Sequence, residues 1–175
     1  MITGKTLGLT AITEEDLPML MEWRNNEDMR QFYREYRELN LHMQTEWYKN
    51  IVNSDKNTIM FAIRAIESNE LLGCCGLTYI NWVNRNAELS LYIGEGNAYI
   101  DSRAYEALGL LIKYGFEQIG MKKLWIECYE IDVKRIKMCE DFSFHLDGVL
   151  RCNVFHNNKW FSSKIFSLLS EEYKG

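Results

Sequence analysis

The segment "YIDSRAYEALGLLIKYGF", residues 99–116, contains the clearest candidate for an anion-binding site. A helix is predicted to begin at Ser102, directly after a loop, and the first N–H groups of a helix have no partner within it. Such groups can hold a phosphate. Phosphate-binding loops are usually rich in glycine, however, and no glycine lies between Tyr99 and Leu108. By spacing alone, an ordinary helix start explains the segment better.

Other patterns with recognisable chemistry are not found. His42, His145 and His156 lie in unrelated contexts, and no serine sits in a G-x-S-x-G motif. The sequence has no H-E-x-x-H motif and no paired Cys/His spacing, so we expect no metal site. The "GEG" at 94–96 lacks the spacing of a dinucleotide-binding motif and is interpreted as a flexible strand exit.

Composition predicts one soluble globular domain spanning residues 1–175, with 47% hydrophobic and 26% charged residues. A net charge of −5 argues against nucleic acid as a partner and is compatible with an amine substrate. Five cysteines without C-x-x-C spacing are interpreted as reduced, buried thiols, as in a cytoplasmic protein. We find no signal peptide and no apolar run near the roughly 18 residues of a membrane span. We therefore expect a cytoplasmic protein with no membrane partner.

Hydrophobic periodicity predicts a mixed order of strands and helices. We expect strands at 6–12, 58–66, 71–80, 84–94 and 124–129, and two more around the turn "HNNK" near the end. Helices are predicted at 13–26, 42–52, 102–119 and 132–142, with Thr13 and Asp132 as N-caps. The helix predicted at 102–119 has an apolar stripe, and Gly120 is predicted to be its C-cap. This order favours an α/β (mixed α+β) fold with a central strand–helix–strand crossover.

Several segments, in this order and spacing, resemble a known family. "DLPMLMEWRNNEDMRQF" is similar to its opening helices, "DVKRIKMCEDFSF" to its N-x-x-A-I-x-x-Y-E-x-x-G-F segment, and "HNNKWFSSKIFSLLSEEY" to its terminal hairpin. The family is the GNAT superfamily of acetyl-CoA-dependent N-acetyltransferases, in the branch that includes the ribosomal-protein N-acetyltransferases. The resemblance covers about residues 7–173. It implies a mostly antiparallel sheet of about seven strands, with a splayed parallel pair holding the cofactor and about four flanking helices.

The resemblance implies an acetyl-CoA site around the start of the 102–119 helix. The family's pyrophosphate loop reads Q/R-x-x-G-x-G/A, and the matching positions hold Tyr99, Ser102 and Ala104. Ser102 restricts close approach, although its hydroxyl can bond a phosphate or cap the helix. Asp101 would repel a pyrophosphate and Arg103 would offset it, so we expect a degenerate site with weaker binding. The implied cofactor contacts are Leu91, Tyr92, Ile93, Tyr99, Ile100, Asp101, Ser102, Arg103, Ala104, Tyr105, Asp132 and Arg135.

The resemblance also implies direct acetyl transfer to an amine in a ternary complex. A backbone N–H around 91–93 would polarise the thioester carbonyl, as in an oxyanion hole. Glu88 is the candidate general base, and Glu127 is a weaker second candidate. Cys139 stands where many members have a tyrosine that protonates the leaving thiolate. For Cys139, a buried small residue is favoured over a catalytic thiol, and Asp132 replaces the family's usual asparagine.

Acceptor selection is expected from Trp23, Arg24, Asn25 and Trp47, which lie in the opening helices. We expect the acceptor to be a primary amine of a small molecule, such as an amino-sugar nucleotide, a polyamine or an antibiotic. The alternative acceptor is a protein N-terminus, as in the ribosomal-protein N-acetyltransferases. The alternative of another class is a non-catalytic binding module of the same fold with a degenerate CoA site. The sequence leaves a monomer or a homodimer open.

Overall fold

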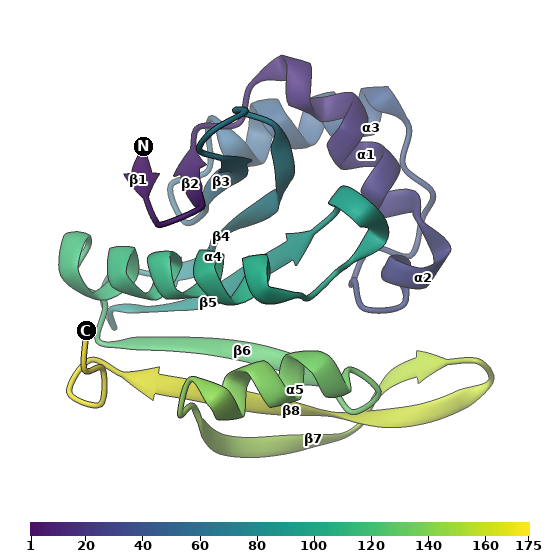
Figure 1. The fold of residues 1–175 in the computed structure, drawn as a ribbon. Helices are drawn as coiled ribbons and strands as arrows, with labels where there is room; N and C mark the ends of the chain where they lie inside the picture. The colour runs from purple at the N-terminus through teal and green to yellow at the C-terminus, as the bar shows by residue number, and fades with distance from the viewer.

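The computed structural model describes residues 1–175 as a single eight-stranded sheet with helices on both faces (Figure 1). The strand order is β1-β2-β3-β4-β5-β6-β8-β7, and every neighbouring pair is antiparallel except β5 and β6. The strands are β1 (Ile2–Thr3), β2 (Leu7–Thr10), β3 (Ile59–Ala65), β4 (Leu71–Asn81), β5 (Asn86–Ile93), β6 (Lys123–Tyr129), β7 (His145–His156) and β8 (Lys159–Leu169). The helices are α1 (Leu17–Asn25), α2 (Glu27–Arg30), α3 (Leu41–Trp47), α4 (Ser102–Lys113) and α5 (Val133–Asp141).

The predicted fold class is confirmed, with small differences in the number of elements. The sheet has β1 in addition to the predicted strands, and α2 was not expected. Both are too short for hydrophobic periodicity to identify, with 2 and 4 residues. The predicted helix at 42–52 is observed as α3 followed by a π-helical turn at Tyr48–Val52.

The splayed parallel pair implied by the family resemblance is present. β5 pairs with β6 only at Asn86–Glu88, opposite Lys123–Trp125. Beyond these residues β5 stays paired with β4 as far as Ile93, and β6 with β8 as far as Tyr129. The two strands therefore diverge in the middle of the sheet (Figure 1), and backbone groups on their facing edges are left for other partners.

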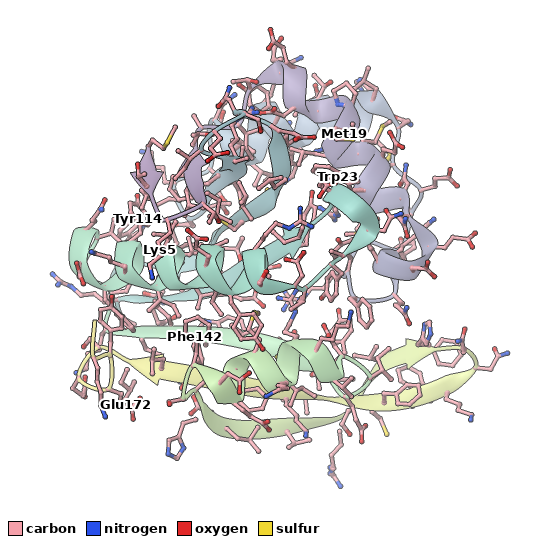
Figure 2. The ribbon with its side chains drawn as sticks, in the orientation of Figure 1. Lys5, Met19, Trp23, Tyr114, Phe142 and Glu172 are labelled. Atoms are coloured by element: carbon pink, nitrogen blue, oxygen red, sulfur yellow. The ribbon has the colours of Figure 1, made fainter.

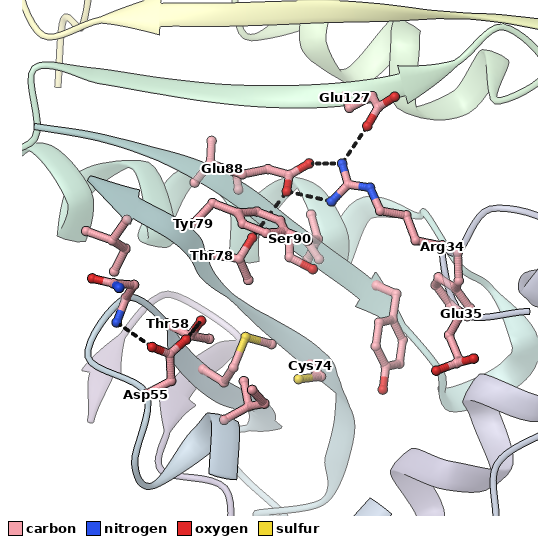
Figure 3. Close-up of a pocket in the computed structure, with 18 of the residues that line it drawn as sticks. Arg34, Glu35, Asp55, Thr58, Cys74, Thr78, Tyr79, Glu88, Ser90 and Glu127 are labelled. Atoms are coloured by element: carbon pink, nitrogen blue, oxygen red, sulfur yellow. Dashed lines mark hydrogen bonds and ion pairs between the residues drawn. The ribbon is translucent and has the colours of Figure 1, made fainter. Parts of the chain in front are cut away.

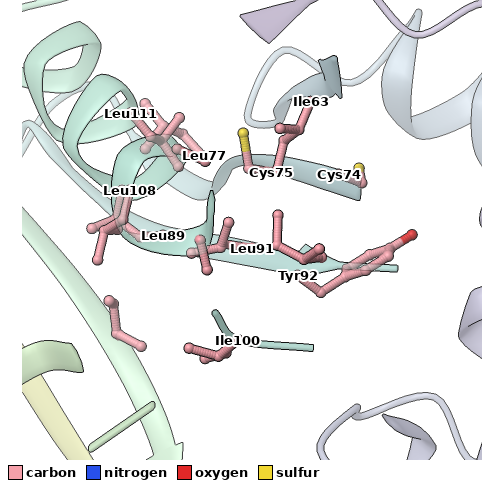
Figure 4. Close-up of a cluster of buried hydrophobic side chains, with 14 of the residues drawn as sticks. Ile63, Cys74, Cys75, Leu77, Leu89, Leu91, Tyr92, Ile100, Leu108 and Leu111 are labelled. Carbon is pink, nitrogen blue, oxygen red and sulfur yellow. The ribbon is translucent and has the colours of Figure 1, made fainter. Parts of the chain in front are cut away.

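Helix α4 packs against β2, β4 and β5 and covers one face of the sheet. The predicted apolar stripe is buried at Ala104, Leu108, Leu111 and Ile112, and Leu108 and Leu111 lie over Leu89 and Leu91 of β5 (Figure 4). A π-helical turn at Tyr114–Gln118 extends the helix, and Gly120 ends it with a φ of +66°. Glycine adopts this left-handed conformation at low cost, as the C-cap prediction requires.

The predicted strand exit at "GEG" is observed, because β5 ends at Ile93. Gly94 also allows a close approach, since a Cβ there would overlap Cδ2 of Trp23, and β5 thus ends directly against the α1 indole (Figure 2). The expectation that all five thiols are buried is wrong for Cys152, which is exposed, whereas the other four are buried and all five are unpaired. No helix is long and apolar enough to cross a membrane.

Candidate active site

A cavity of about 970 Å³ lies on the face of the sheet opposite α4 (Figure 3). Strand alternation places Glu88, Ser90 and Tyr92 of β5 on this face, while the intervening leucines point toward α4. Gln44 and Trp47 of α3 line another side, together with residues of the loop that follows α2. This volume suits a small-molecule ligand.

Glu88 and Glu127 come together where β5 and β6 separate. Glu88 lies opposite Trp125 in the register, and Glu127 is two residues further along β6, so both carboxylates lie on the cavity face. Their side chains are only 7% and 11% exposed. Two buried carboxylates at one point require positive charge or hydrogen-bond donors nearby.

Arg34, from the loop after α2, supplies that charge (Figure 3). Its Nη1 donates to Glu88 Oε2 at 2.8 Å, and its Nη2 donates to Glu88 Oε1 and, at 2.6 Å, to Glu127 Oε2. The guanidinium carbon also lies 5.6 Å from the centroid of the Tyr79 ring. Hydrogen bonding to Glu88 raises the pKa of Arg34 above its ordinary value, so the residue stays a cation.

Glu127 is further fixed by the terminal hairpin. Ser163 Oγ and Asn153 Nδ2 donate to its Oε1 at 2.6 and 2.8 Å. Burial raises the pKa of Glu127, but the hydrogen bonds from Ser163 and Arg34 outweigh burial, so the net pKa is lowered. Glu127 is therefore a carboxylate at neutral pH.

The open edge of β5 presents a hydrogen-bond donor to the splay. The C=O of Leu91 accepts from Arg135 Nη2 at 2.8 Å, and the N–H of Ile93 donates to the C=O of Tyr99 at 2.9 Å. These groups point away from β4. Because the N–H and C=O of one strand residue share a side, the N–H of Leu91 also points into the splay. An extended amide-containing chain would fit beside this edge.

A buried polar cluster closes the far end of the splay. Tyr99 Oη donates to Asp132 Oδ2 at 2.8 Å and accepts from Arg135 Nη2 at 2.7 Å, and Arg135 Nε reaches Asp132 Oδ2 at 3.2 Å. Tyr99 has a φ of +51° and stacks on Phe32 with ring centroids 4.6 Å apart. Three predicted cofactor contacts therefore bind one another, and they tie β5, the following loop and α5 together.

The start of α4 is capped by a carboxylate. Asp101, not Ser102, is the N-cap, because its Oδ1 accepts from the N–H of Arg103 at 2.9 Å. The Arg103 guanidinium pairs with Asp101 and also with Glu95. Burial raises the pKa of Asp101, but the Arg103 hydrogen bonds outweigh it and lower the net pKa. A pyrophosphate here would compete with two carboxylates for one guanidinium.

The predicted cofactor residues thus fall into two groups. Four of them line the cavity: Leu91, Tyr92, Asp132 and Arg135. The remaining eight lie outside it, at the end of β5 and around the start of α4, where Ala104 and Ile100 are buried in the core and Tyr105 Oη donates to Asp141. They are Ile93, Tyr99, Ile100, Asp101, Ser102, Arg103, Ala104 and Tyr105.

Of the predicted acceptor residues, Arg24 and Trp47 line the cavity. The structure does not support the other two, because Trp23 packs against Gly94 and Asn25 exchanges two 2.8 Å hydrogen bonds with the backbone of Leu39. Asn25 thereby anchors the loop rather than facing a ligand.

Cys139 is buried, with its Sγ 3.6 Å from that of Cys128, and it does not line the cavity. This placement favours the interpretation as a small core residue. The sequence reasoning missed Arg34 and Tyr33, whose hydroxyl is buried in the cavity wall without a partner. Nothing in the run "QFYREYREL" distinguishes them from an exposed loop.

A family model described as an acetyltransferase (GNAT) domain matches residues 6–145. The chain therefore belongs to the GNAT acetyltransferase family. It is 30% identical over 115 residues to an uncharacterized N-acetyltransferase, p20, of Bacillus licheniformis, a match spanning 66% of this chain and 64% of that protein.

Among solved structures, this chain is similar in fold to the spermidine N-acetyltransferase of Vibrio cholerae in complex with CoA and spermine. The TM-score is 0.84 at 21% identity, covering 97% of this chain and 98% of that one. A dodecameric structure of the Vibrio cholerae enzyme gives a TM-score of 0.80 at 22% identity, with 97% of each chain covered. At these identities the likeness concerns the fold.

Proposed function

We propose that residues 1–175 form one N-acetyltransferase domain that moves the acetyl group of acetyl-CoA to a primary amine of a small cationic molecule, such as a polyamine. Family membership supports the reaction class. The observation that carries the acceptor class is the Glu88–Glu127 pair, which faces a cavity and holds a guanidinium. Two carboxylates that bind one organic cation are suited to bind another.

The residues of the splay fit the donor substrate in part. The N–H of Leu91 points into the splay between β5 and β6, where it would donate to a carbonyl oxygen of an extended chain. Arg103 at the start of α4 is the cation available to a pyrophosphate, although Asp101 and Glu95 already occupy it. When bound, acetyl-CoA supplies the acetyl group as a thioester. Because Arg103 is already engaged at the start of α4, we expect acetyl-CoA to bind weakly rather than not at all.

Glu88 is the proposed general base. An amine must lose a proton before it can attack, and a carboxylate beside the open edge of β5 can take that proton directly or through a water. Thr78 Oγ1 lies 3.3 Å from Glu88 Oε2 and helps to orient the carboxylate. Glu127, fixed by Ser163, would hold the ammonium rather than remove its proton, because its lowered pKa makes it a weak base.

Two measurements test this proposal. Calorimetric titration should detect acetyl-CoA binding, and free thiol should be released when spermidine is added. A panel containing an amino-sugar nucleotide and a peptide with a free N-terminus compares the acceptor classes, including the ribosomal-protein type. No heat of binding at millimolar acetyl-CoA would instead identify a non-catalytic GNAT-fold module, the alternative that Asp101 and Glu95 favour.

A further inference from the structure

Arg34 is held in the cavity by the two residues that precede it. Phe32 stacks on Tyr99, and Tyr33 packs at 5.6 Å from the ring of Tyr92. After Arg34 in the chain, the backbone of Leu39 exchanges two hydrogen bonds with the side chain of Asn25. The loop is thus attached to the body on both sides of Arg34, and this attachment directs the guanidinium onto the carboxylates.

All four oxygens of the two carboxylates are engaged while Arg34 is in place. Both oxygens of Glu88 accept from Arg34. Glu127 Oε2 also accepts from Arg34, and its Oε1 accepts from Ser163 and Asn153. Nη2 of Arg34 lies between Glu88 Oε1 and Glu127 Oε2 and donates to both. An ammonium group that binds both carboxylates must take this position, so an acceptor amine can bridge the pair only by displacing the guanidinium.

The exposures indicate which partner can move. The Arg34 side chain is 45% exposed, whereas the glutamates are almost fully buried in their strands. A guanidinium that leaves the pair regains water at little cost, but the carboxylates cannot follow it. The exchangeable component of the site is therefore the cation, and the buried carboxylates form its fixed receptor.

We propose that Arg34 determines acceptor specificity by acting as an internal competitor for the amine subsite. The inference rests on the proposed function, because it assumes that the acceptor amine binds between Glu88 and Glu127. The acceptor's ammonium exchanges with the guanidinium and no covalent bond changes. Amines with several charges, which gain contacts elsewhere in the cavity, overcome this competition more readily than monoamines.

Arg34→Ala tests the competition, with Arg37→Ala as the matched control. Arg37 lies in the same loop and pairs with a glutamate, Glu35, but it does not line the cavity. Calorimetry with methylguanidinium and with spermidine, in the absence of acetyl-CoA, measures occupation of the subsite directly. We expect Arg34→Ala to bind both cations at least about tenfold more tightly than the wild type and Arg37→Ala.

Equal or weaker cation binding by folded Arg34→Ala would overturn the proposal and leave Arg34 as a structural clamp. Arg34→Met keeps the aliphatic stem and provides a second variant if alanine prevents folding. In the wild type, spermidine should speed up amide hydrogen exchange in residues 31–40. Unchanged or slower amide exchange would also contradict the displacement of Arg34. Because these readouts need no acetyl-CoA, a protein that binds cations but transfers no acetyl group would refute the proposed function and retain the role of Arg34.

Discussion

Replacing Arg135 by methionine tests whether the buried Tyr99–Asp132–Arg135 cluster holds the splayed strands in place. Arg135 is 9% exposed, and its side chain donates to Tyr99 Oη, Asp132 Oδ2 and the C=O of Leu91. Methionine keeps the length and the helix propensity but removes the charge and every donor. The Asp132 carboxylate, 3% exposed, would then be buried without its cation.

The expected loss can be worked out from the contacts. Removing one partner of a buried ion pair costs about 3–5 kcal/mol. Asp132 retains hydrogen bonds from Tyr99 Oη and from the backbone N–H of residue 135, so the lower end, about 3 kcal/mol, is expected. In a chain of 175 residues, each 1 kcal/mol lowers Tm by about 2–4 °C, so Tm should fall by roughly 6–12 °C.

Thermal unfolding followed by circular dichroism measures this change. The matched control is Lys137→Met on the same helix, whose pair with Asp141 is exposed at 70% and 40%. The control should leave Tm unchanged, because exposed pairs on a helix surface are well solvated. If Arg135→Met lowers Tm by less than about 2 °C, the cluster does not hold the splay and the argument from burial fails.

Three further predictions concern packing, pH and thiol access. Gly94→Ala should destabilise the protein by about 1–3 kcal/mol in urea denaturation, because its Cβ would overlap Trp23, whereas Gly148→Ala, with open space around it, should not. Burial raises the pKa of Glu106, but hydrogen bonds from the Thr6 hydroxyl and from the 5–7 backbone outweigh it and lower the net pKa below the ordinary 4.5. This stabilisation is present above pH 4.5 and is lost as the pH falls through the lowered pKa, so Glu106→Gln should flatten the stability–pH curve there, and an unchanged slope would contradict it. Native protein should react with Ellman's reagent at one thiol per chain, Cys152, and the other four should react only after unfolding.

Local patterns were enough to predict most of the fold. The apolar stripe of α4 and the strict alternation of β6 are properties of single segments, and both have the predicted periods in the structure. The N-cap at Asp132 was also predictable, because its side chain accepts from a residue three positions later. In contrast, the turn between β1 and β2 has a long-range contact, because the N–H groups of Lys5 and Thr6 donate to Glu106 Oε1, 101 and 100 residues later.

The candidate site was only partly predictable, because its decisive contacts are long-range. Glu88 was proposed through the resemblance, but its partner Arg34 lies 54 residues earlier in a loop without a recognisable pattern. Trp23 was expected to face the acceptor, yet its indole packs in the core against Gly94, which leaves room for it because it has no side chain. No local feature of either residue indicates these pairings.

The carboxylate of Glu88 is proposed to activate an amine for acetylation. The most direct measurement is thiol release from acetyl-CoA with spermidine by the wild type, by Glu88→Gln and by Glu67→Gln, an exposed control. We predict that Glu88→Gln lowers kcat by about 10²–10⁴-fold at neutral pH, that raising the pH partly restores it, and that the control matches the wild type. Turnover by Glu88→Gln equal to that of the wild type would contradict the account.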